Sequence, residues 1–503
     1  MTGPVAAWRQ LDRLTVAVTA LRVLGVSVAA AVPSGYWLSR ALSPGAAVLV
    51  LVSGVLVVVA GACVVDHLRW RRFHYRVLPD RFELRKGIVV RSRRSLHRDR
   101  IRAVDISASP LLRLFRLVHV KVGTGEQTEG DESSLSLQPV RRGEADRLRR
   151  ALLDHAAEPG SGPRQSGVLS TLDPAWVRYA PVSFVTPALG AAAFGAVLQV
   201  AQWFGLESSV VTWVLDRLRA LPLLTAIVVL VVIGMIVGAI AAAAVFVEMW
   251  WQYRLEREPG GTLRVRRGLL TTRSLSVEER RLRGVDLVEP LGNRLLGAAR
   301  VDAIATGLTQ RKQDQQGAHN TLQPAAPRAV ADRVAAAVLR EAVSPTAAAG
   351  LRSHPRAARG RRVRWALAAV AAVELPLVVL GLTIAPVLLI VAGISAVVLV
   401  PVAVGLAFAA YRSLGHGITG DYLVVRHGPV RRSTAALQRG GVIGWRLRQS
   451  YFQRRRGLLT VTATTAAGAQ AYSAHDADRH AGLAFADEAV VGLLAPFLER
   501  AEP

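Results

Sequence analysis

Cysteine is almost absent from this chain of 503 residues, in which the single example is Cys63. One cysteine cannot form an intrachain disulfide, and a thiolate metal site requires several. Cys63 lies within a long apolar run, where a thiol behaves as a small hydrophobic side chain. The sequence therefore predicts that Cys63 is a small hydrophobic residue of a helix.

The chain also lacks the common catalytic signatures. None of the patterns HExxH, GxxxxGK[ST] and GxSxG occurs, and these patterns carry well-understood metal, phosphate and nucleophile chemistry. His67, His74, His97 and His119 occur singly, in settings where a solvated or packed histidine is more common than a metal ligand. We therefore expect no catalytic residue, no metal site, no cofactor and no enzymatic activity.

Acidic residues are few, because 36 Asp and Glu face 63 Lys and Arg, for a formal net charge of +27. The basic residues are almost all arginine. Such a balance favours nucleic acid or an anionic membrane surface as a partner, or it is only the positive charge that flanks membrane spans. The aromatic residues gather near the ends of apolar runs, so the sequence does not favour nucleic acid.

Long hydrophobic runs are abundant, and hydrophobic residues make up 51% of the chain. Six runs are long enough to cross a bilayer as helices. They cover residues 14–33, 45–65, 182–203, 222–247, 365–384 and 387–410. The first two follow each other at once, which predicts an uncleaved helical hairpin and not a signal peptide. Arg22 interrupts the first run and is explained by snorkelling to the interface or by a later helix start.

One basic segment occurs three times. A glycine after the first basic strand precedes a closing glycine by 38, 39 and 40 residues, in the ranges Gly87–Gly125, Gly268–Gly307 and Gly428–Gly468. Each segment contains an alternating apolar stretch, LVHVKV, ARVDAIA or LTVTAT, which is typical of a strand with one buried face. The chain is therefore interpreted as three copies of one unit, each with a pair of spans before it.

The basic residues predict the orientation. Lys plus Arg number 23 in residues 66–181, 22 in 248–364 and 12 in 411–503, against one in 34–44 and two in 204–221. Basic loops stay in the cytoplasm. The sequence thus predicts a multi-pass membrane protein with both termini and all three soluble domains in the cytoplasm.

The repeated segment resembles the bacterial pleckstrin-homology-like domain of YdbS/YdbT-type membrane proteins. The residues that carry the resemblance are Arg85-Lys86-Gly87, Arg100-Ile101, Ser109-Pro110-Leu111-Leu112-Arg113 and Val118 to Gly125, with Arg267-Gly268, Arg281-Leu282, Glu289-Pro290-Leu291 and Arg294-Leu295-Leu296-Gly297 in the second copy. The third copy departs from the pattern, since Ser450-Tyr451-Phe452 replaces the Pro-Leu step.

The resemblance implies an α+β membrane protein, located in the bacterial cytoplasmic membrane. Three transmembrane helical hairpins, six helices in all, would each be followed by a cytoplasmic β-sandwich or partly open barrel with a C-terminal helix. The expected divisions are hairpin 1 at 1–66, domain 1 at 67–156, a linker at 157–181, hairpin 2 at 182–249, domain 2 at 250–342, a linker at 343–364, hairpin 3 at 365–411 and a divergent domain 3 at 412–503.

Arginine clusters are the candidate binding residues, because guanidinium groups bind phosphate oxygens in pairs of hydrogen bonds. The candidates are Arg91, Arg93, Arg94, Arg98, Arg100 and Arg102 in the first copy, Arg280, Arg281 and Arg283 in the second, and Arg454, Arg455 and Arg456 in the third. The alternative is that they only hold each domain against the bilayer or pair with acids such as Asp99, Asp105, Glu278 and Glu279.

Glu374 is the one carboxylate well inside a span, and an ionisable group at that depth is a functional candidate. It could pair with Arg22, or with Gln199 and Gln202, in a transporter or export component. Its alternative role is a hydrogen bond between helices. Glycines at 190, 195, 234 and 238 suit close helix packing, the last two as a GxxxG-like pair.

Together these features predict a non-enzymatic scaffold that presents three basic domains at the anionic leaflet. The expected partners are anionic lipid headgroups and a membrane protein or a second copy of the chain, without nucleic acid. Attachment in tandem would give avidity even to weak individual contacts.

Overall fold

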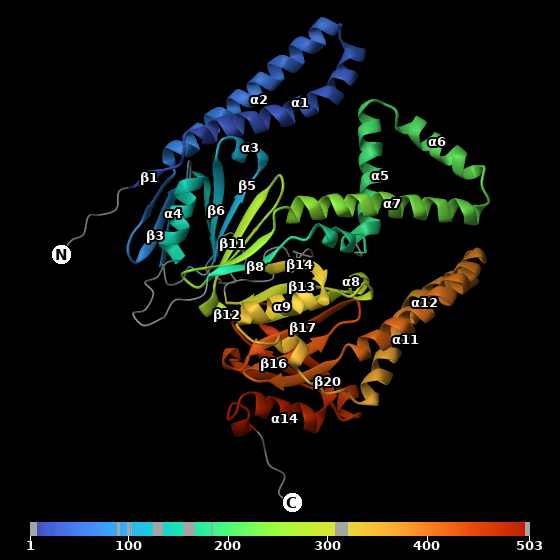
Figure 1. Ribbon diagram of the computed structural model, residues 1–503. Coiled ribbons are helices and arrows are strands. Elements are labelled where there is room, and N and C mark those ends of the chain that lie inside the picture. The colour runs from blue at the N-terminus through green and yellow to red at the C-terminus, as the bar shows by residue number, and fades with distance from the viewer. Residues whose placement is uncertain are drawn as a thin grey trace, which may run out of the picture. The chain divides into compact units, whose positions relative to one another are not determined.

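The computed structural model describes residues 8–87, 91–97, 101, 103–123, 134–153, 166–182, 185–306 and 320–497 (Figure 1). They belong to two compact units, residues 1–279 and residues 280–503. The limit between the units lies inside the range 250–342 expected for the second soluble domain. The eight divisions expected from the sequence therefore stay a prediction.

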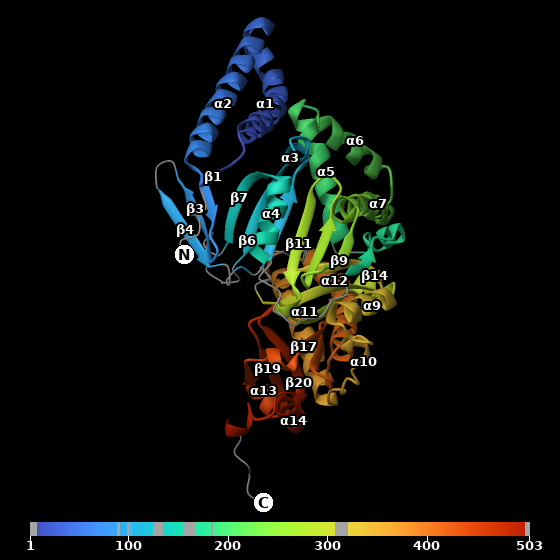
Figure 2. The same ribbon diagram turned by 60° about the vertical axis from the view of Figure 1, so that its left-hand side comes forward.

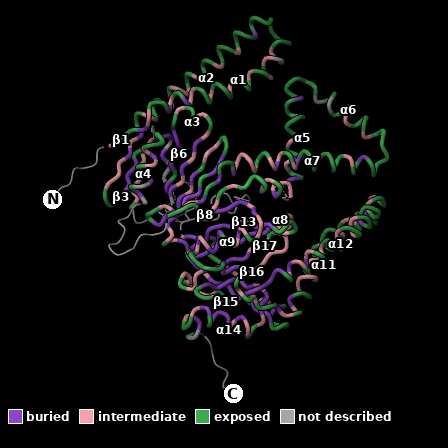
Figure 3. Tube along the Cα trace, in the orientation of Figure 1, coloured by how far each residue is buried: buried purple, intermediate pink, exposed green. Residues whose placement is uncertain are grey.

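Six helices of the described residues are long and apolar enough to cross a membrane. They are α1 (Leu14–Ala41), α2 (Pro44–Arg72), α5 (Val185–Trp203), α7 (Leu223–Trp250), α11 (Arg356–Thr383) and α12 (Val387–Arg412). Most of their side chains are exposed (Figure 3), as expected for helices that are apolar on all sides. α2 and α11 extend into basic sequence beyond the apolar runs, because arginine and alanine are good helix formers.

The six helices pack in three pairs, α1 with α2, α5 with α7, and α11 with α12. α6 (Glu207–Arg219) lies between α5 and α7 in the sequence. The α5–α7 contact is close, because a Cβ at Gly190 would lie 2.3 Å from the carbonyl oxygen of Gly234 and one at Gly238 would lie 2.2 Å from that of Thr186. A Cβ at Gly195 would meet nothing within 4 Å. Two of the four glycines singled out in these spans therefore lie where only hydrogen fits.

Residues 1–279 contain two antiparallel sheets. The first has the strand order β1-β2-β3-β4 and the second β7-β6-β5-β11-β10-β9-β8. The strands are β1 (Arg9–Gln10), β2 (His74–Val77), β3 (Arg81–Lys86), β4 (Ser92–His97), β5 (Ala103–Ala108), β6 (Leu117–Gly123), β7 (Ser134–Arg141), β8 (Gly167–Thr171), β9 (Arg254–Glu258), β10 (Thr262–Arg267) and β11 (Thr272–Glu278). Its shorter helices are α3 (Pro110–Leu114), α4 (Arg142–Leu153) and the 3₁₀ helix η3 (Pro174–Tyr179).

One hydrophobic core joins both sheets of this unit. Tyr75 and Phe82, from the first sheet, are fully buried with Val120 of β6 and Leu152 of α4. The alternation of apolar and polar residues in each strand directs one face to this core. The helix α4 covers it, with its own apolar side chains one helical turn apart.

Residues 280–503 contain sheets of order β14-β13-β12-β17-β16-β15 and β18-β19-β20. The strands are β12 (Leu282–Pro290), β13 (Ala298–Ala305), β14 (Thr321–Pro327), β15 (Gly415–Thr419), β16 (Tyr422–His427), β17 (Arg431–Gln438), β18 (Gly444–Arg448), β19 (Leu458–Thr464) and β20 (Ala471–Asp478). The shorter helices are α8 (Leu291–Leu295), α9 (Arg328–Leu339), α10 (Pro345–Ala348), α13 (Tyr451–Arg454), α14 (Arg479–Ala489) and the 3₁₀ helices η4 (Glu279–Arg281), η5 (Arg439–Gly441) and η6 (Ala495–Phe497). Phe485 of α14 lies in the core between the sheets with Leu437 and Val461.

The long sheets combine strands from successive copies of the repeat. β5 of the first copy pairs with β11 of the second, and β12 of the second pairs with β17 of the third; all four strands are labelled in Figure 1, and Figure 2 shows β11 and β17 from a second side. These two strand pairings, the junctions between copies, have the same register. Asp105 faces Leu275 in the first and Asp286 faces Ala435 in the second, and both pairs are at the same repeat position. The repeats are therefore joined by strand pairing, a feature that the sequence analysis did not predict.

Candidate functional site

Each copy carries a short helix at the same place in the repeat. It is α3 after β5, α8 after β12 and α13 after β18. The third residue of each helix is buried, as Leu112, Asn293 or Gln453. In α13 the Ser450 hydroxyl accepts a hydrogen bond from the Gln453 N–H, and the Gln453 side chain accepts one from the Ser450 N–H at 2.9 Å. This capping box starts the helix where the first two copies use proline.

α13 presents large apolar side chains to the outside. Tyr451 and Phe452 are 55% and 59% exposed. Phe452 shares a shallow hollow of about 300 Å³ with Arg361, Arg364 and Trp365 from the start of α11. Because the apolar run of α11 begins at about Trp365, Phe452 lies at the end of a candidate membrane span. Exposed aromatic side chains at that level are typical of the lipid interface.

Asp476 of β20 connects the start of α11 to α13. Its carboxylate, 1% exposed, accepts from Arg361 Nη1 at 2.6 Å, from Arg362 Nη2 at 3.2 Å and from Gln453 Nε2 at 2.8 Å. A buried carboxylate with two guanidinium partners and an amide is well satisfied. The candidate span and the aromatic helix are thus attached to one buried acid.

The arginines of the third cluster are exposed on or directly after α13. Arg455 stacks over the Tyr451 ring, with its guanidinium carbon 5.0 Å from the ring centroid. Within residues 320–497 no ion pair involves Arg454, Arg455 or Arg456. Their place in the repeat is that of α3, so they do not correspond in position to the first arginine cluster, on and around β4.

The first cluster is only partly described, because Arg98, Arg100 and Arg102 lie outside the described residues, as does Asp99. Arg91 is exposed just before β4, and Arg94 is half-buried on it. Arg93 forms an ion pair of 3.1 Å with the buried Glu83, which also binds Arg76 at 2.8 Å. Pairing with a nearby acid was one of the two expectations, but Glu83 was not among the acids named. The signal that could have identified Glu83 is its place in the predicted strand, where it is the one acid among basic residues.

The second cluster lies at the start of the β12 segment. Arg280 is exposed and Arg281 half-buried in η4, while Arg283 is half-buried on β12. The side chain of Arg283 packs on Gly441, where a Cβ would lie 3.2 Å from its Cδ. These arginines belong to a different element from Arg454 to Arg456. Arg281 and Arg283 hold the repeat positions of Arg100 and Arg102 in the first cluster, so the third cluster is the one that differs in its place in the repeat.

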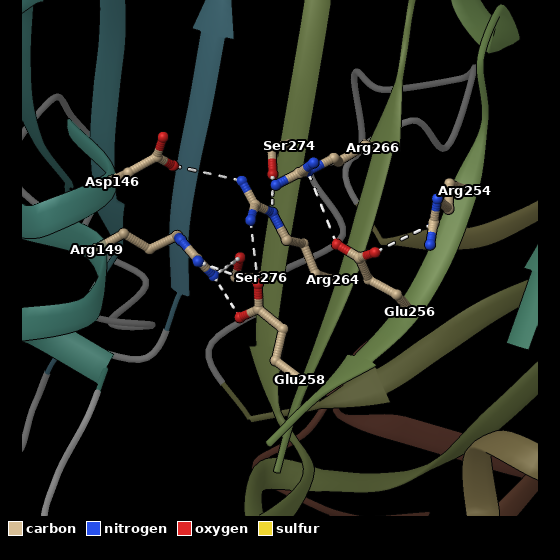
Figure 4. A network of polar contacts seen from close by, with 9 residues as sticks. All are labelled: Asp146, Arg149, Arg254, Glu256, Glu258, Arg264, Arg266, Ser274 and Ser276. Carbon is tan, nitrogen blue, oxygen red and sulfur yellow. Dashed lines mark hydrogen bonds and ion pairs between the residues drawn. The ribbon is translucent and has the colours of Figure 1, made fainter. Parts of the chain in front are cut away.

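Two other arginines, one from each copy, hold the first and second copies together (Figure 4). Arg149 of α4 binds Glu258 of β9 at 2.6 and 3.1 Å, and Arg264 of β10 binds the same carboxylate at 3.0 Å. Burial favours protonation of Glu258, but the two guanidinium groups outweigh it and lower its pKa. Asp146 and Ser276 complete this group. Part of the positive charge of the chain is therefore paired with acids inside the protein.

The second junction contains a similar group. Glu289 of β12 is buried, and Arg432 of β17 and Arg328 of α9 bind it at 2.6 and 2.8 Å. Burial would raise the pKa of Glu289, but Arg432 and Arg328 lower it overall. Ser433 donates to Asp286 across the same pair of strands at 2.6 Å. In this junction the acids and Arg328 lie on the earlier copy, and Arg432 lies on the later one.

Glu374, the intramembrane candidate, accepts hydrogen bonds from the Ser395 hydroxyl of α12 at 2.9 and 3.1 Å. Gln199 and Gln202, proposed as its partners, bind each other at 3.2 Å. The Ser395 contact is a hydrogen bond between helices, the simpler of the two interpretations of Glu374. The transport alternative gains no support from it.

Two histidines that the sequence analysis did not single out are buried together. The rings of His354 and His416 lie 5.0 Å apart, and His416 also packs on Phe485. Among the described residues no group hydrogen-bonds to any of their ring nitrogens. Burial lowers the pKa of both histidines to about 4. The neighbouring His416 adds to this effect on His354, and Arg352 adds to it on His416. The pair is distant in sequence, so no local pattern marks it.

We expect acid to destabilise residues 280–503 through this pair. The unfolded chain binds protons at these histidines below pH 6.5, whereas the folded chain binds them only near pH 4, so stability falls as the pH drops through this window. The loss is about 2 kcal/mol for each histidine at pH 5. Burial raises the pKa of Asp286 to about 6, which offsets about 1 kcal/mol at pH 5.

Thermal unfolding of the full chain in an uncharged detergent, at pH 7 and pH 5, measures this effect. The melting temperature is expected to be lower at pH 5. In the variant His354→Leu/His416→Leu the difference between the two pH values should shrink, because neither site can titrate. An equal difference in both proteins would contradict the assignment.

Comparison with known proteins supplies a family. A family model described as "Bacterial PH domain" matches residues 19–156, 184–342 and 367–499, most of the chain. The UPF0699 transmembrane protein YdbT of Bacillus subtilis (strain 168) is 22% identical over 415 residues, which are 79% of this chain and 80% of that protein. No solved structure matches the chain. The three matched ranges each contain a helical pair and the strands that follow it.

Proposed function

Because this chain belongs to the bacterial PH domain family and is a membrane protein with three such repeats, we propose that it is a scaffold that holds anionic lipid headgroups. The main binding element is α13 of the third repeat. In this proposal the helical pairs are transmembrane hairpins, and each soluble part is a pleckstrin-homology-like sandwich at the cytoplasmic leaflet. Three basic repeats on one chain would add avidity to each weak contact.

One observation carries this proposal: Phe452 lies beside Trp365, where a candidate span begins, and three exposed arginines follow it. An aromatic side chain at the interface and adjacent guanidinium groups form the usual combination for an anionic leaflet. Each arginine near such a surface contributes about 1 kcal/mol. Arg454 to Arg456 together are therefore worth about 3 kcal/mol in dilute salt.

The arginines of the first two clusters have a smaller part in the proposal. Arg93 is paired with Glu83, and Arg281 and Arg283 are half-buried. A guanidinium group that is already paired with an acid, or that is half-buried, is less available to bind a headgroup. We propose that Arg91, which is exposed just before β4, supports the attraction to the leaflet, while the third repeat makes the specific contact.

A probe on α13 tests the lipid contact. The full chain, with Cys63→Ala to remove the native thiol and Tyr451→Cys to attach a polarity-sensitive dye, is reconstituted into vesicles of phosphatidylcholine alone or mixed with phosphatidylglycerol. We expect the dye to report a less polar environment in the mixed vesicles. Added salt should reverse the change, since it screens the attraction.

Charge reversal at the three arginines, Arg454→Glu/Arg455→Glu/Arg456→Glu, should abolish the difference between the two vesicles. The control is Arg333→Glu, which removes an exposed arginine from α9, a helix that packs on a different sheet. That variant should behave as the parent does. If the dye reports the same environment in both kinds of vesicle, α13 does not bind the anionic surface.

A further inference from the structure

The strand β18 of the third copy corresponds to β5 of the first and β12 of the second. In the first two copies a strand of the next copy pairs along this strand. β11 pairs along β5 and β17 pairs along β12. β18 lies at the end of the order β18-β19-β20, and among the described residues no strand pairs with its outer side. Its outward N–H and C=O groups are therefore open for pairing.

The side chains of β18 agree with an uncovered junction strand. Leu447 is 39% exposed, whereas the residues at the same repeat position, Ile106 and Leu287, are 9% and 0% exposed. An aliphatic side chain at this position is buried when a further strand is present. β18 thus has the apolar residue of a covered strand without the cover.

Charge distinguishes β18 from the other two junction strands. The aspartate of the first two copies, Asp105 or Asp286, is replaced by Arg446 in the third. Arg446 and the neighbouring Arg448 are exposed, and neither is in an ion pair with a described residue. In the β12/β17 junction Asp286 accepts a hydrogen bond from Ser433 of the incoming strand, and Glu289, three residues further along, pairs with Arg432 of that strand. The sign at β18 is the reverse, so an incoming strand should carry the acids.

A second copy of this chain does not meet that requirement. Its open edge of matching position is β4, which ends the order β1-β2-β3-β4. In the register shared by both junctions, Arg94 of β4 would lie directly opposite Arg446. Like charges directly opposite each other destabilise a strand pair. Pairing between copies is therefore disfavoured.

We propose that β18 is a docking edge for an extended strand of another protein, with acidic side chains opposite Arg446 and Arg448. The strand would add to the sheet as β11 adds to β5, with main-chain hydrogen bonds for affinity and the two arginines for selectivity. The residue between the two acids would be apolar and would lie opposite Leu447. The proposal concerns the strand edge and does not depend on lipid binding by α13.

The internal junctions define a probe for this edge. In their register the positions of Ser433 and Ala435 face Arg448 and Arg446, and Thr434 faces Leu447. We therefore use a labelled peptide of residues 431–438 with Thr434→Val and with glutamate at the positions of Ser433 and Ala435. The matched control peptide has lysine at both. Fluorescence anisotropy with the full chain in uncharged detergent should show about tenfold tighter binding of the acidic peptide.

The variant Arg446→Glu/Arg448→Glu should reverse this preference, while Arg454→Glu/Arg455→Glu/Arg456→Glu should leave it unchanged. A proline within the acidic peptide should abolish binding, because it removes a main-chain donor. Equal binding of the acidic and lysine peptides, a preference that survives the reversal, or binding of the proline peptide would overturn the proposal. Tighter binding of a peptide of residues 91–97 would also overturn it, in favour of a second copy as partner.

Discussion

Replacing Asp476 with alanine is expected to lower the free energy of local unfolding around β20 by about 3–5 kcal/mol. Asp476 is 1% exposed, and its partners Arg361 and Arg362 are only 23% and 21% exposed. The substitution leaves two partly buried guanidinium groups and the amide of Gln453 without their acceptor. Breaking a buried pair from one side costs much more than the pair contributes as a whole.

The backbone increases this cost, because Asp476 has a φ of +57°. Aspartate tolerates this left-handed conformation better than alanine does. Hydrogen exchange on peptides that cover residues 451–478, in the full chain in detergent, reports the free energy of opening. The start of α11 and α13 should lose protection together with β20, because all three are bound to this carboxylate.

Asp478→Ala is the matched control two residues away. Asp478 caps α14 by accepting from the N–H groups of His480 and Ala481, and such a cap contributes about 1 kcal/mol. Adding Arg361→Met and Arg362→Met to the Asp476→Ala variant should restore part of the lost protection, because no unpaired cation then remains. Equal losses in the two aspartate variants would refute the role given to Asp476.

Replacing Gly284 with alanine is expected to separate β12 from β17 at a cost of about 3 kcal/mol. A Cβ at Gly284 would lie 1.9 Å from the carbonyl oxygen of Ala436, a backbone atom that cannot move without the strand. The β12–β13 pairing is irregular between Leu282 and Gly284. A bulge of this kind turns the backbone toward its neighbour and leaves no room for a side chain.

The repeat offers a control at the same position. A Cβ at Gly444, in the third copy, would lie 3.2 Å from Thr464 Oγ1, a side-chain atom that can move. Gly444→Ala is thus expected to change stability by less than about 1 kcal/mol. Hydrogen exchange of residues 431–438 compares the two variants. Similar protection in both would show that the β12/β17 junction does not depend on Gly284.

The third copy illustrates why the candidate site was only partly predictable. The basic run RQSYFQRRR was apparent in the sequence, and Arg454 to Arg456 were proposed as a surface. Their neighbours Trp365 and Asp476 were not, because each is separated from them by a long stretch of chain. A contact between a span, a strand and a short helix has no local pattern.

The strand junctions were missed for a similar reason. Alternation predicts that β5 and β12 are strands, but it does not state which strand lies beside them. Each copy was expected to contain its own sheet, whereas β5 pairs with β11 and β12 pairs with β17. Strand pairing depends on backbone hydrogen bonds, which are the same for every sequence, so the choice of neighbour is made by the packing of the whole unit.

By itself the amino-acid sequence determined the six apolar helices, the threefold repeat and the family. These follow from hydrophobic run lengths and periodic patterns, which act locally along the chain. Only the tertiary structure decided which arginines are paired inside and which remain exposed, because an arginine's partner is set by three-dimensional proximity. It likewise decided that no strand of the described residues pairs with the outer side of β18, since an edge exists only once the other strands have found their neighbours.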